Sequence, residues 1–136
     1  MVADPKMISV VDDDASVRAA TDNLLKSLGY AVSTFVSAED FLQSGRFNDI
    51  SCVIADVQMP GMSGVDLQAQ LISQGHRMPF IFITAFPEKL VRARALKAGA
   101  ICFLTKPFDR LTLIGCLDAA LERHGGGTGE IGRAHV

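Results

Sequence analysis

Five short apolar segments alternate along this chain with five longer segments of helical pattern, and this alternation limits the possible folds more than any other feature. The apolar segments are Met7–Val11, Ala31–Phe35, Cys52–Ala55, Phe80–Thr84 and Ile101–Leu104. The helical segments are Ala15–Leu28, Ala38–Ser44, Gly64–Ser73, Pro87–Ala98 and Asp109–Arg123. Strands that alternate with helices predict a parallel sheet with helices on both faces. We therefore expect an α/β fold built on a doubly wound, five-stranded parallel sheet.

The ends of these segments carry residues that favour helix boundaries. Asp14 and Ser37 stand where N-caps are expected. Glycines that favour a C-terminal stop follow four of the helical segments, at Gly29, Gly45, Gly75 and Gly99. The central segments "CVIA" and "FIFI" are apolar throughout, which is typical of strands buried on both faces.

Length and charge indicate one compact domain without a broad nucleic-acid surface. The 136 residues suit a single domain, which we place at residues 1–124. The tail 125–136, "GGGTGEIGRAHV", has five glycines and no periodicity, so it is expected to be a flexible tail, a linker or vector-derived. The net charge of −2 argues against direct nucleic-acid binding, and no apolar run has the length of a membrane helix.

The three cysteines, Cys52, Cys102 and Cys116, lie in unrelated contexts. Their odd number and lack of any Cys-x-x-Cys pattern argue against a disulfide framework and against a metal site. This usage is typical of a reducing cytosol, so the sequence predicts a cytoplasmic protein.

Polar side chains follow four of the five predicted strands. They are Asp12 and Asp13 after the first strand, Asp56 after the third, Thr84 at the end of the fourth, and Thr105, Lys106 and Pro107 after the fifth. In an open parallel sheet, ligands bind outside the carboxyl ends of the strands. We therefore expect three carboxylates, a hydroxyl and an amine to meet at one edge.

This set of groups suits phosphoryl chemistry. Clustered carboxylates repel one another, and a hard cation such as Mg²⁺ relieves the repulsion. One carboxylate can then act as a nucleophile toward phosphorus and form an acyl phosphate. Lys106 would pair with the charge of the transferred group, and the hydroxyl of Thr84 would donate to it.

Each residue also has a simpler explanation when taken alone. Asp14 is best explained as a helix cap, and Asp56 could cap the turn "MPGMSG". The Thr84 hydroxyl could bond a nearby backbone carbonyl. The convergence of all these groups at one edge favours the phosphate-and-metal interpretation.

The sequence resembles the receiver domains of two-component response regulators from about Lys6 to Arg123. The resemblance rests on "VVDDD" (Val10–Asp14), "IADVQMPGMSG" (Ile54–Gly64), "ITA" (Ile83–Ala85), "KAGA" (Lys97–Ala100) and "KPF" (Lys106–Phe108). Three further stretches, "SAEDFL", "GMSGVDLQAQL" and "PFIFITAF", are most similar to the nitrogen-fixation-regulator (FixJ) branch. The family's strand order is 2-1-3-4-5.

The resemblance implies a role for each site residue. Asp56 would be the phosphoacceptor for a histidine kinase or phosphotransfer protein. Asp12, Asp13, Asp56 and the backbone carbonyl of Gln58 would hold Mg²⁺, with Mn²⁺ as an alternative. Lys106 and Thr84 would contact the phosphoryl group, and Phe103 would be the aromatic whose rotamer follows Thr84. Gln58 and Phe86 occupy positions where the family varies and sets its dephosphorylation rate, and a bulky Phe86 is expected to shield the acyl phosphate.

The helical segment Pro87–Ala98 is a candidate partner surface. At about 100° per residue, one side carries Val91, Ala95 and Ala98. The other carries Lys89, Arg92, Leu96 and Lys97, with Leu90 near the edge. One interpretation is a solvated helix with scattered leucines, and the other is a docking face with a basic rim. The family's output surface lies at this place, which favours the second and allows a phosphorylation-dependent homodimer.

Three other functions remain as alternatives. A Mg²⁺-dependent phosphohydrolase would need an acid two residues after its nucleophile, where this chain has Gln58. A nucleotide- or flavin-binding module would need a glycine-rich loop after the first strand, which instead ends in aspartates. The third is an interaction module that works without phosphate.

Members of the FixJ branch usually continue into a DNA-binding domain, so the chain is either a single-domain regulator or part of a longer protein.

Overall fold

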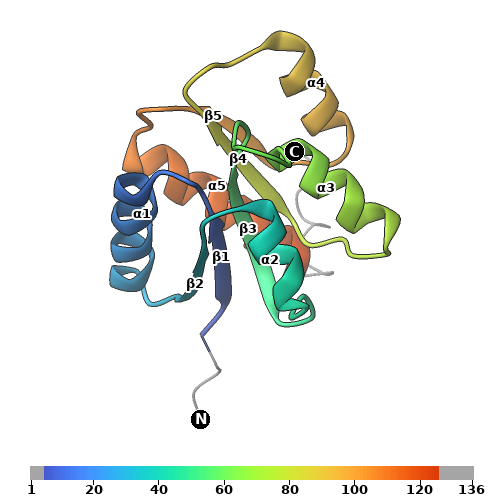
Figure 1. Cartoon of the computed structure of the whole chain (residues 1–136). Helices are drawn as coiled ribbons and strands as arrows, with labels where there is room; N and C mark the ends of the chain where they lie inside the picture. The colour runs from blue at the N-terminus through green and yellow to red at the C-terminus, as the bar shows by residue number, and fades with distance from the viewer. Residues whose placement is uncertain (1–4, 126–136) are drawn as a thin grey trace.

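The computed structural model describes residues 5–125 and shows a three-layer α/β arrangement (Figure 1). The parallel sheet has the strand order β2-β1-β3-β4-β5, which confirms the expected fold. Its strands are β1 (Met7–Val11), β2 (Ala31–Phe35), β3 (Ile50–Asp56), β4 (Phe80–Thr84) and β5 (Cys102–Thr105). The helices are α1 (Ala15–Ser27), α2 (Ala38–Ser44), α3 (Gly64–Ser73), α4 (Lys89–Lys97) and α5 (Arg110–Gly125).

The two expected N-caps are confirmed by hydrogen bonds. The Asp14 side chain accepts from the backbone N–H groups of Ser16 and Val17, and the Ser37 side chain accepts from Asp40. Four glycines have positive φ at the ends of helices, as the sequence predicts: Gly29, Gly45, Gly75 and Gly99. Helix α5 ends at Gly125, the first residue of the expected tail 125–136. The other tail residues, 126–136, lie outside the described part of the chain.

Five elements differ at their ends from the sequence prediction. Helix α1 ends at Ser27, one residue early, and α5 spans Arg110–Gly125 rather than Asp109–Arg123. Strand β3 begins earlier, at the buried Ile50, and includes Asp56, which pairs with Ile83 of β4. Helix α4 begins at Lys89 rather than Pro87 because Glu88 keeps an extended backbone. Strand β5 runs from Cys102 to Thr105, one residue later than expected.

Each face of the sheet has its own apolar cluster. One face packs against α1 and α5 through residues such as Leu25, Leu113 and Leu117. The other packs against α2, α3 and α4 through residues such as Phe41 and Leu71. Since both faces are covered, the central strands are apolar throughout and the polar groups gather at their carboxyl ends. None of the helices within residues 5–125 is long and apolar enough to cross a membrane.

The cysteines contradict the expectation that this chain lacks disulfides. Cys102 of β5 and Cys116 of α5 form a disulfide with a Cα–Cα distance of 6.1 Å. They are 14 residues apart in sequence, but α5 lies against the sheet, and both side chains belong to the cluster under α5. Pattern-based reasoning missed the pair because it depends on this packing. Cys52 is a buried free thiol, and burial raises its pKa to about 12.

Candidate functional site

Three carboxylates meet at the carboxyl edge of the sheet. Asp12 and Asp13 follow β1, and Asp56 is the last residue of the neighbouring β3, so the parallel register brings them together. Each offers an oxygen within 4.8 Å of those of the other two. Asp12 and Asp56 are buried, whereas Asp13 is exposed. The cluster therefore has two acids anchored in the protein and one that faces solvent.

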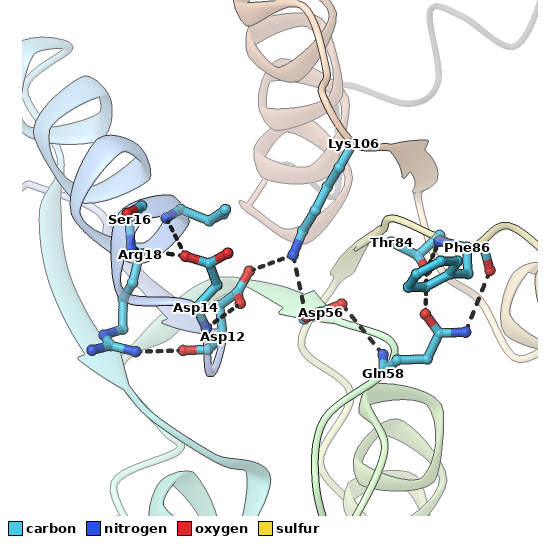
Figure 2. Close-up of polar contacts among 10 residues, drawn as sticks. Asp12, Asp14, Ser16, Arg18, Asp56, Gln58, Thr84, Phe86 and Lys106 are labelled. Atoms are coloured by element: carbon cyan, nitrogen blue, oxygen red, sulfur yellow. Dashed lines mark hydrogen bonds and ion pairs between the residues drawn. The ribbon is translucent and has the colours of Figure 1, made fainter.

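Lys106 lies between the two buried carboxylates. Its Nζ is 3.2 Å from Oδ2 of Asp12 and 3.2 Å from Oδ2 of Asp56 (Figure 2). Lys106 follows β5, and its peptide bond to Pro107 is cis. Burial lowers the pKa of Lys106, but the two facing carboxylates more than offset this effect, so the net shift is upward. The amine is therefore charged at neutral pH.

The carboxyl of Asp56 is harder to ionise here than in water. Burial and the neighbouring Asp12 carboxylate raise the pKa of Asp56 to about 6. Lys106 and the backbone N–H of Gln58, which donates to Oδ1 at 3.3 Å, oppose the rise but do not cancel it. A site that still disfavours a carboxylate after pairing it with one amine has room for a further positive charge.

The donor set fits a hard divalent cation. All three groups are carboxylates, which Mg²⁺ prefers together with water and phosphate oxygens. Within the described part of the chain, the buried Oδ2 of Asp12 accepts no hydrogen bond, although it makes the ion pair with Lys106. Beside this ion pair the oxygen keeps a lone pair that a metal could use. Asp12, Asp13 and Asp56 are the residues that would hold such an ion.

The fourth strand brings Thr84 to the same edge, and its side chain is fully buried. The hydroxyl of Thr84 donates to Oε1 of Gln58 at 3.0 Å and accepts from the backbone N–H of Phe86 at 3.0 Å. The amide of Gln58 in turn donates from Nε2 to the carbonyl of Phe86 at 3.4 Å (Figure 2). The Thr84 hydroxyl is therefore bonded to a side chain, which sequence reasoning did not foresee.

Further contacts that support the site were missed from the sequence. The Arg18 guanidinium donates to the carbonyl of Asp12 at 2.7 Å. The Glu39 carboxylate accepts from the backbone N–H of Met62 at 2.9 Å, and this bond helps to lower the pKa of Glu39. Both contacts hold loops beside the acidic cluster. They join long side chains to backbone groups on other parts of the chain, so no local sequence motif predicts them.

Gly64 allows α3 to begin directly against the acceptor strand. A Cβ at Gly64 would clash with the backbone carbonyl oxygen of Asp56 and lie 3.3 Å from the Phe82 ring. Gly64 ends the turn "MPGMSG", and a glycine is needed at this position because two backbones approach closely.

Helix α4 exposes its basic residues but not all of the predicted surface. Lys89, Arg92 and Lys97 are exposed, and Leu90 is 85% exposed. Leu96 is only partly exposed and packs against the cluster that α3 and α4 share, so its predicted place on the outer side is wrong. Helix α4 packs on the sheet through Val91, Ala95 and Leu96, so Leu96 lies on the edge of the inner side rather than among the exposed basic residues.

Phe103 of β5 lies on the same face of the sheet as α4. It is half-buried, and its ring centroid is 6.3 Å from that of Phe82. Phe103 pairs with Phe82 across the β4–β5 ladder, and Thr84 pairs with Thr105 two residues further. The aromatic side chain and the buried hydroxyl thus lie on adjacent strands.

Comparison with known proteins gives one consistent result. Residues 8–118 match the family described as the response regulator receiver domain. The response regulator protein TodT of Pseudomonas putida is 41% identical over 85% of this chain and 51% of its own length. The transcriptional regulatory protein FixJ of Azorhizobium caulinodans is 40% identical over 85% of this chain and 55% of its own length. The chain spans about half the length of the curated relatives it matches.

Solved structures agree with the sequence relatives. The response regulator StyR superposes with a TM-score of 0.83 at 42% identity, covering 97% of this chain and 64% of that one. The structure titled FixJ-N gives a TM-score of 0.77 at 33% identity, covering 89% of this chain and 96% of that one. With the acidic edge and the lysine already located, these matches establish that the chain belongs to the receiver domain family of two-component response regulators.

Proposed function

We propose that this receiver accepts a phosphoryl group on Asp56 from a histidine kinase or phosphotransfer protein and thereby switches its α4–β5–α5 surface. The observation that carries the proposal is the position of Asp56. It ends a buried strand beside two further carboxylates, with Lys106 Nζ 3.2 Å from its Oδ2. A nucleophile needs such a rigid support and an open edge.

The transfer would proceed by in-line displacement. A carboxylate oxygen of Asp56 forms a bond to phosphorus while the phosphorus–nitrogen bond of the donor phosphohistidine breaks. The electron pair of that bond stays on the imidazole nitrogen, which takes a proton from solvent. Lys106 leaves its ion pair with Asp56 and contacts the transferred group. A Mg²⁺ ion held by Asp12, Asp13, Asp56 and the carbonyl of Gln58, or Mn²⁺ in its place, supplies charge neutralisation when bound.

The state of the switch would be read at α4, β5 and α5. Thr84 turns toward the phosphoryl group, and Phe103 on the adjacent strand follows it. The exposed Lys89, Arg92 and Lys97 and the largely exposed Leu90 then form the docking face for a partner, a second copy or an output domain. This is a shift between conformations, so the protein works as a switch rather than as a turnover enzyme.

The proposal also covers where the receiver acts and whether an output domain is joined to it. The relative FixJ is named a transcriptional regulatory protein, and this chain spans about half of it. We infer that the receiver, residues 1–124, acts in the cytoplasm without binding nucleic acid itself, either alone or joined to a DNA-binding output domain. The Cys102–Cys116 disulfide removes the cysteine argument for this location, which now rests on what is typical of the family. The side chain two residues after Asp56 is an amide, which disfavours a phosphohydrolase.

Intact mass after incubation with acetyl phosphate tests the proposal. We expect one phosphoryl adduct in the presence of Mg²⁺ and none in EDTA or in Asp56→Asn. Asp49→Asn, which changes an exposed carboxylate away from the site, should behave as the wild type. An adduct that persists in Asp56→Asn would contradict the proposal. No adduct, when a known receiver is modified in parallel, would favour the interaction module that works without phosphate.

A further inference from the structure

The side chains of Gln58 and Thr84 and the backbone of Phe86 form a closed ring of three hydrogen bonds. The Thr84 hydroxyl donates to Oε1 of Gln58 at 3.0 Å, and Nε2 of Gln58 donates to the Phe86 carbonyl at 3.4 Å. The backbone N–H of Phe86 donates back to the Thr84 hydroxyl oxygen at 3.0 Å. Figure 2 shows the ring at the right of the site, with the amide of Gln58 below Phe86. Each donor in the ring meets one acceptor, so the arrangement is self-consistent.

The ring determines how the amide of Gln58 is oriented. The carbonyl of Phe86 can only accept, so the nitrogen of the amide must face it. The amide oxygen then faces Thr84, and because this oxygen can only accept, the Thr84 hydroxyl donates to it while accepting from the Phe86 N–H. The opposite amide orientation would set the amide oxygen against the Phe86 carbonyl, which leaves two acceptors facing each other.

We propose that Gln58 is a positioning residue that holds the Thr84 hydroxyl in the unphosphorylated state and so sets the cost of switching. This inference rests on the proposed function, in which Thr84 turns to the phosphoryl group. A hydroxyl has one hydrogen to donate, so Thr84 cannot serve Gln58 and a phosphoryl oxygen with the same bond. The Thr84 side chain is fully buried, so water does not readily replace Gln58 as its acceptor. Each switching event therefore loses the bond to Gln58.

The position of Gln58 separates this role from that of a metal ligand. Its backbone N–H bonds to Oδ1 of Asp56, and its carbonyl is the proposed metal ligand, whereas the holding contact uses only the amide side chain. A side-chain substitution can thus remove the contact with Thr84 and keep the backbone groups. The alternative is that the Gln58 side chain influences the phosphoryl group directly, by occupying space beside it.

A double-mutant cycle distinguishes a Gln58 side chain that holds the Thr84 hydroxyl from one that acts directly on the phosphoryl group. The probe is beryllofluoride with Mg²⁺, a phosphoryl mimic, and its affinity is measured for the wild type, Gln58→Met, Thr84→Val and the double variant. Met keeps the length of Gln but removes both amide contacts. We expect Gln58→Met to bind the probe about 2- to 10-fold more tightly, the range expected for one hydrogen bond. In the Thr84→Val background the same substitution should have no effect. Gln43→Met, an exposed change on α2, is the matched control.

The outcomes are separable from a failure of the proposed function. Unchanged affinity in Gln58→Met overturns the inference. An equal gain in the wild-type and the Thr84→Val backgrounds also overturns it, because the effect then bypasses the hydroxyl. If the wild type itself fails to bind beryllofluoride with Mg²⁺, the proposed function fails and the inference fails with it.

Discussion

The most constrained single residue is Asp56, whose carboxylate is costly to ionise without a metal. Its pKa in the folded protein is about 6, above its usual range, chiefly because of burial and then Asp12. Between about pH 4 and pH 6 the folded state therefore binds more protons than the unfolded state, and stability falls as the pH rises. Above about pH 6 the Asp56 carboxyl is ionised in both states, and its full destabilising effect on the folded state is present. We predict that metal-free Asp56→Asn is more stable than the wild type at pH 7.5 by about 1–2 kcal/mol.

Chemical denaturation in EDTA from pH 4 to 8 checks this prediction. The advantage of Asp56→Asn should shrink as the pH falls from 6 to 4. Asp49→Asn, in which an exposed carboxylate is changed, should show no comparable pH-dependent gain. A wild type that becomes more stable between pH 5 and pH 7, relative to Asp56→Asn, would contradict the raised pKa.

The adjacent acids Asp13 and Asp14 allow a matched test of the metal site. The Asp13 carboxylate belongs to the acidic cluster, whereas Asp14 caps α1. Asn is an equally good N-cap, so Asp14→Asn should keep its stability and its response to Mg²⁺. We predict that Mg²⁺ at tenfold above its Kd stabilises the wild type by about 1.4 kcal/mol and Asp13→Asn by much less. Thermal unfolding against Mg²⁺ measures both, and equal responses of the two variants would remove Asp13 from the site.

At the scale of elements, α3 begins directly against the end of β3. A Cβ at Gly64 would clash with the carbonyl of Asp56, so either α3 or the end of β3 must move. We predict that Gly64→Ala costs about 1–3 kcal/mol of stability and slows phosphorylation by acetyl phosphate. Gly115→Ala in α5 meets no atom within 4 Å and should stabilise by about 0.5–1 kcal/mol. Equal effects of the two substitutions would contradict the close approach.

The disulfide between β5 and α5 makes a second prediction at this scale. It closes a loop between residues 14 apart, and the chain-entropy model gives about 3 kcal/mol for a loop of this size. Reductant should therefore lower the stability of the wild type. The variant Cys102→Ser with Cys116→Ser should be insensitive to reductant, because the remaining Cys52 is a buried free thiol. Chemical denaturation with and without reductant measures this effect. Identical unfolding curves of the wild type under the two conditions would contradict the disulfide.

The elements also show where sequence reasoning succeeds and where it stops. The doubly wound parallel sheet and the acidic edge could be predicted, because they follow from alternation and from residues at strand ends such as Asp12 and Asp56, whereas the strand order came only from the resemblance to receiver domains. The Cys102–Cys116 bond and the inward turn of Leu96 could not, because they depend on how α5 and α4 rotate against the sheet. The contact of Gln58 with Thr84 depends on the path of the loop after β3, which carries Gln58 and which no periodic pattern records.

For the whole molecule, the expected output surface is basic with exposed apolar groups. On α4, Leu90 is 85% exposed, and the basic residues Arg92 and Lys97 are exposed as well. On α5, Leu111 is 70% exposed. Charge reversal at Arg92 and Lys97 to Glu should weaken self-association of the phosphorylated protein about tenfold or more, since the new carboxylates would repel the acidic groups that these two basic side chains are proposed to face in the other copy. Sedimentation of the beryllofluoride form measures it. Arg46→Glu, after α2, is the control, and unchanged association would place the interface elsewhere.

The proposed switch requires that Asp56 itself carries the phosphoryl group. The most direct measurement is reduction of the acetyl phosphate-treated, Mg²⁺-loaded protein with borohydride, which converts an acyl phosphate to an alcohol, followed by peptide mass mapping. We expect homoserine at position 56 and at no other acid, and no homoserine in EDTA. Homoserine at position 12 or 13 instead, or an adduct that survives on the Thr84 hydroxyl, would show that Asp56 is not the phosphoacceptor.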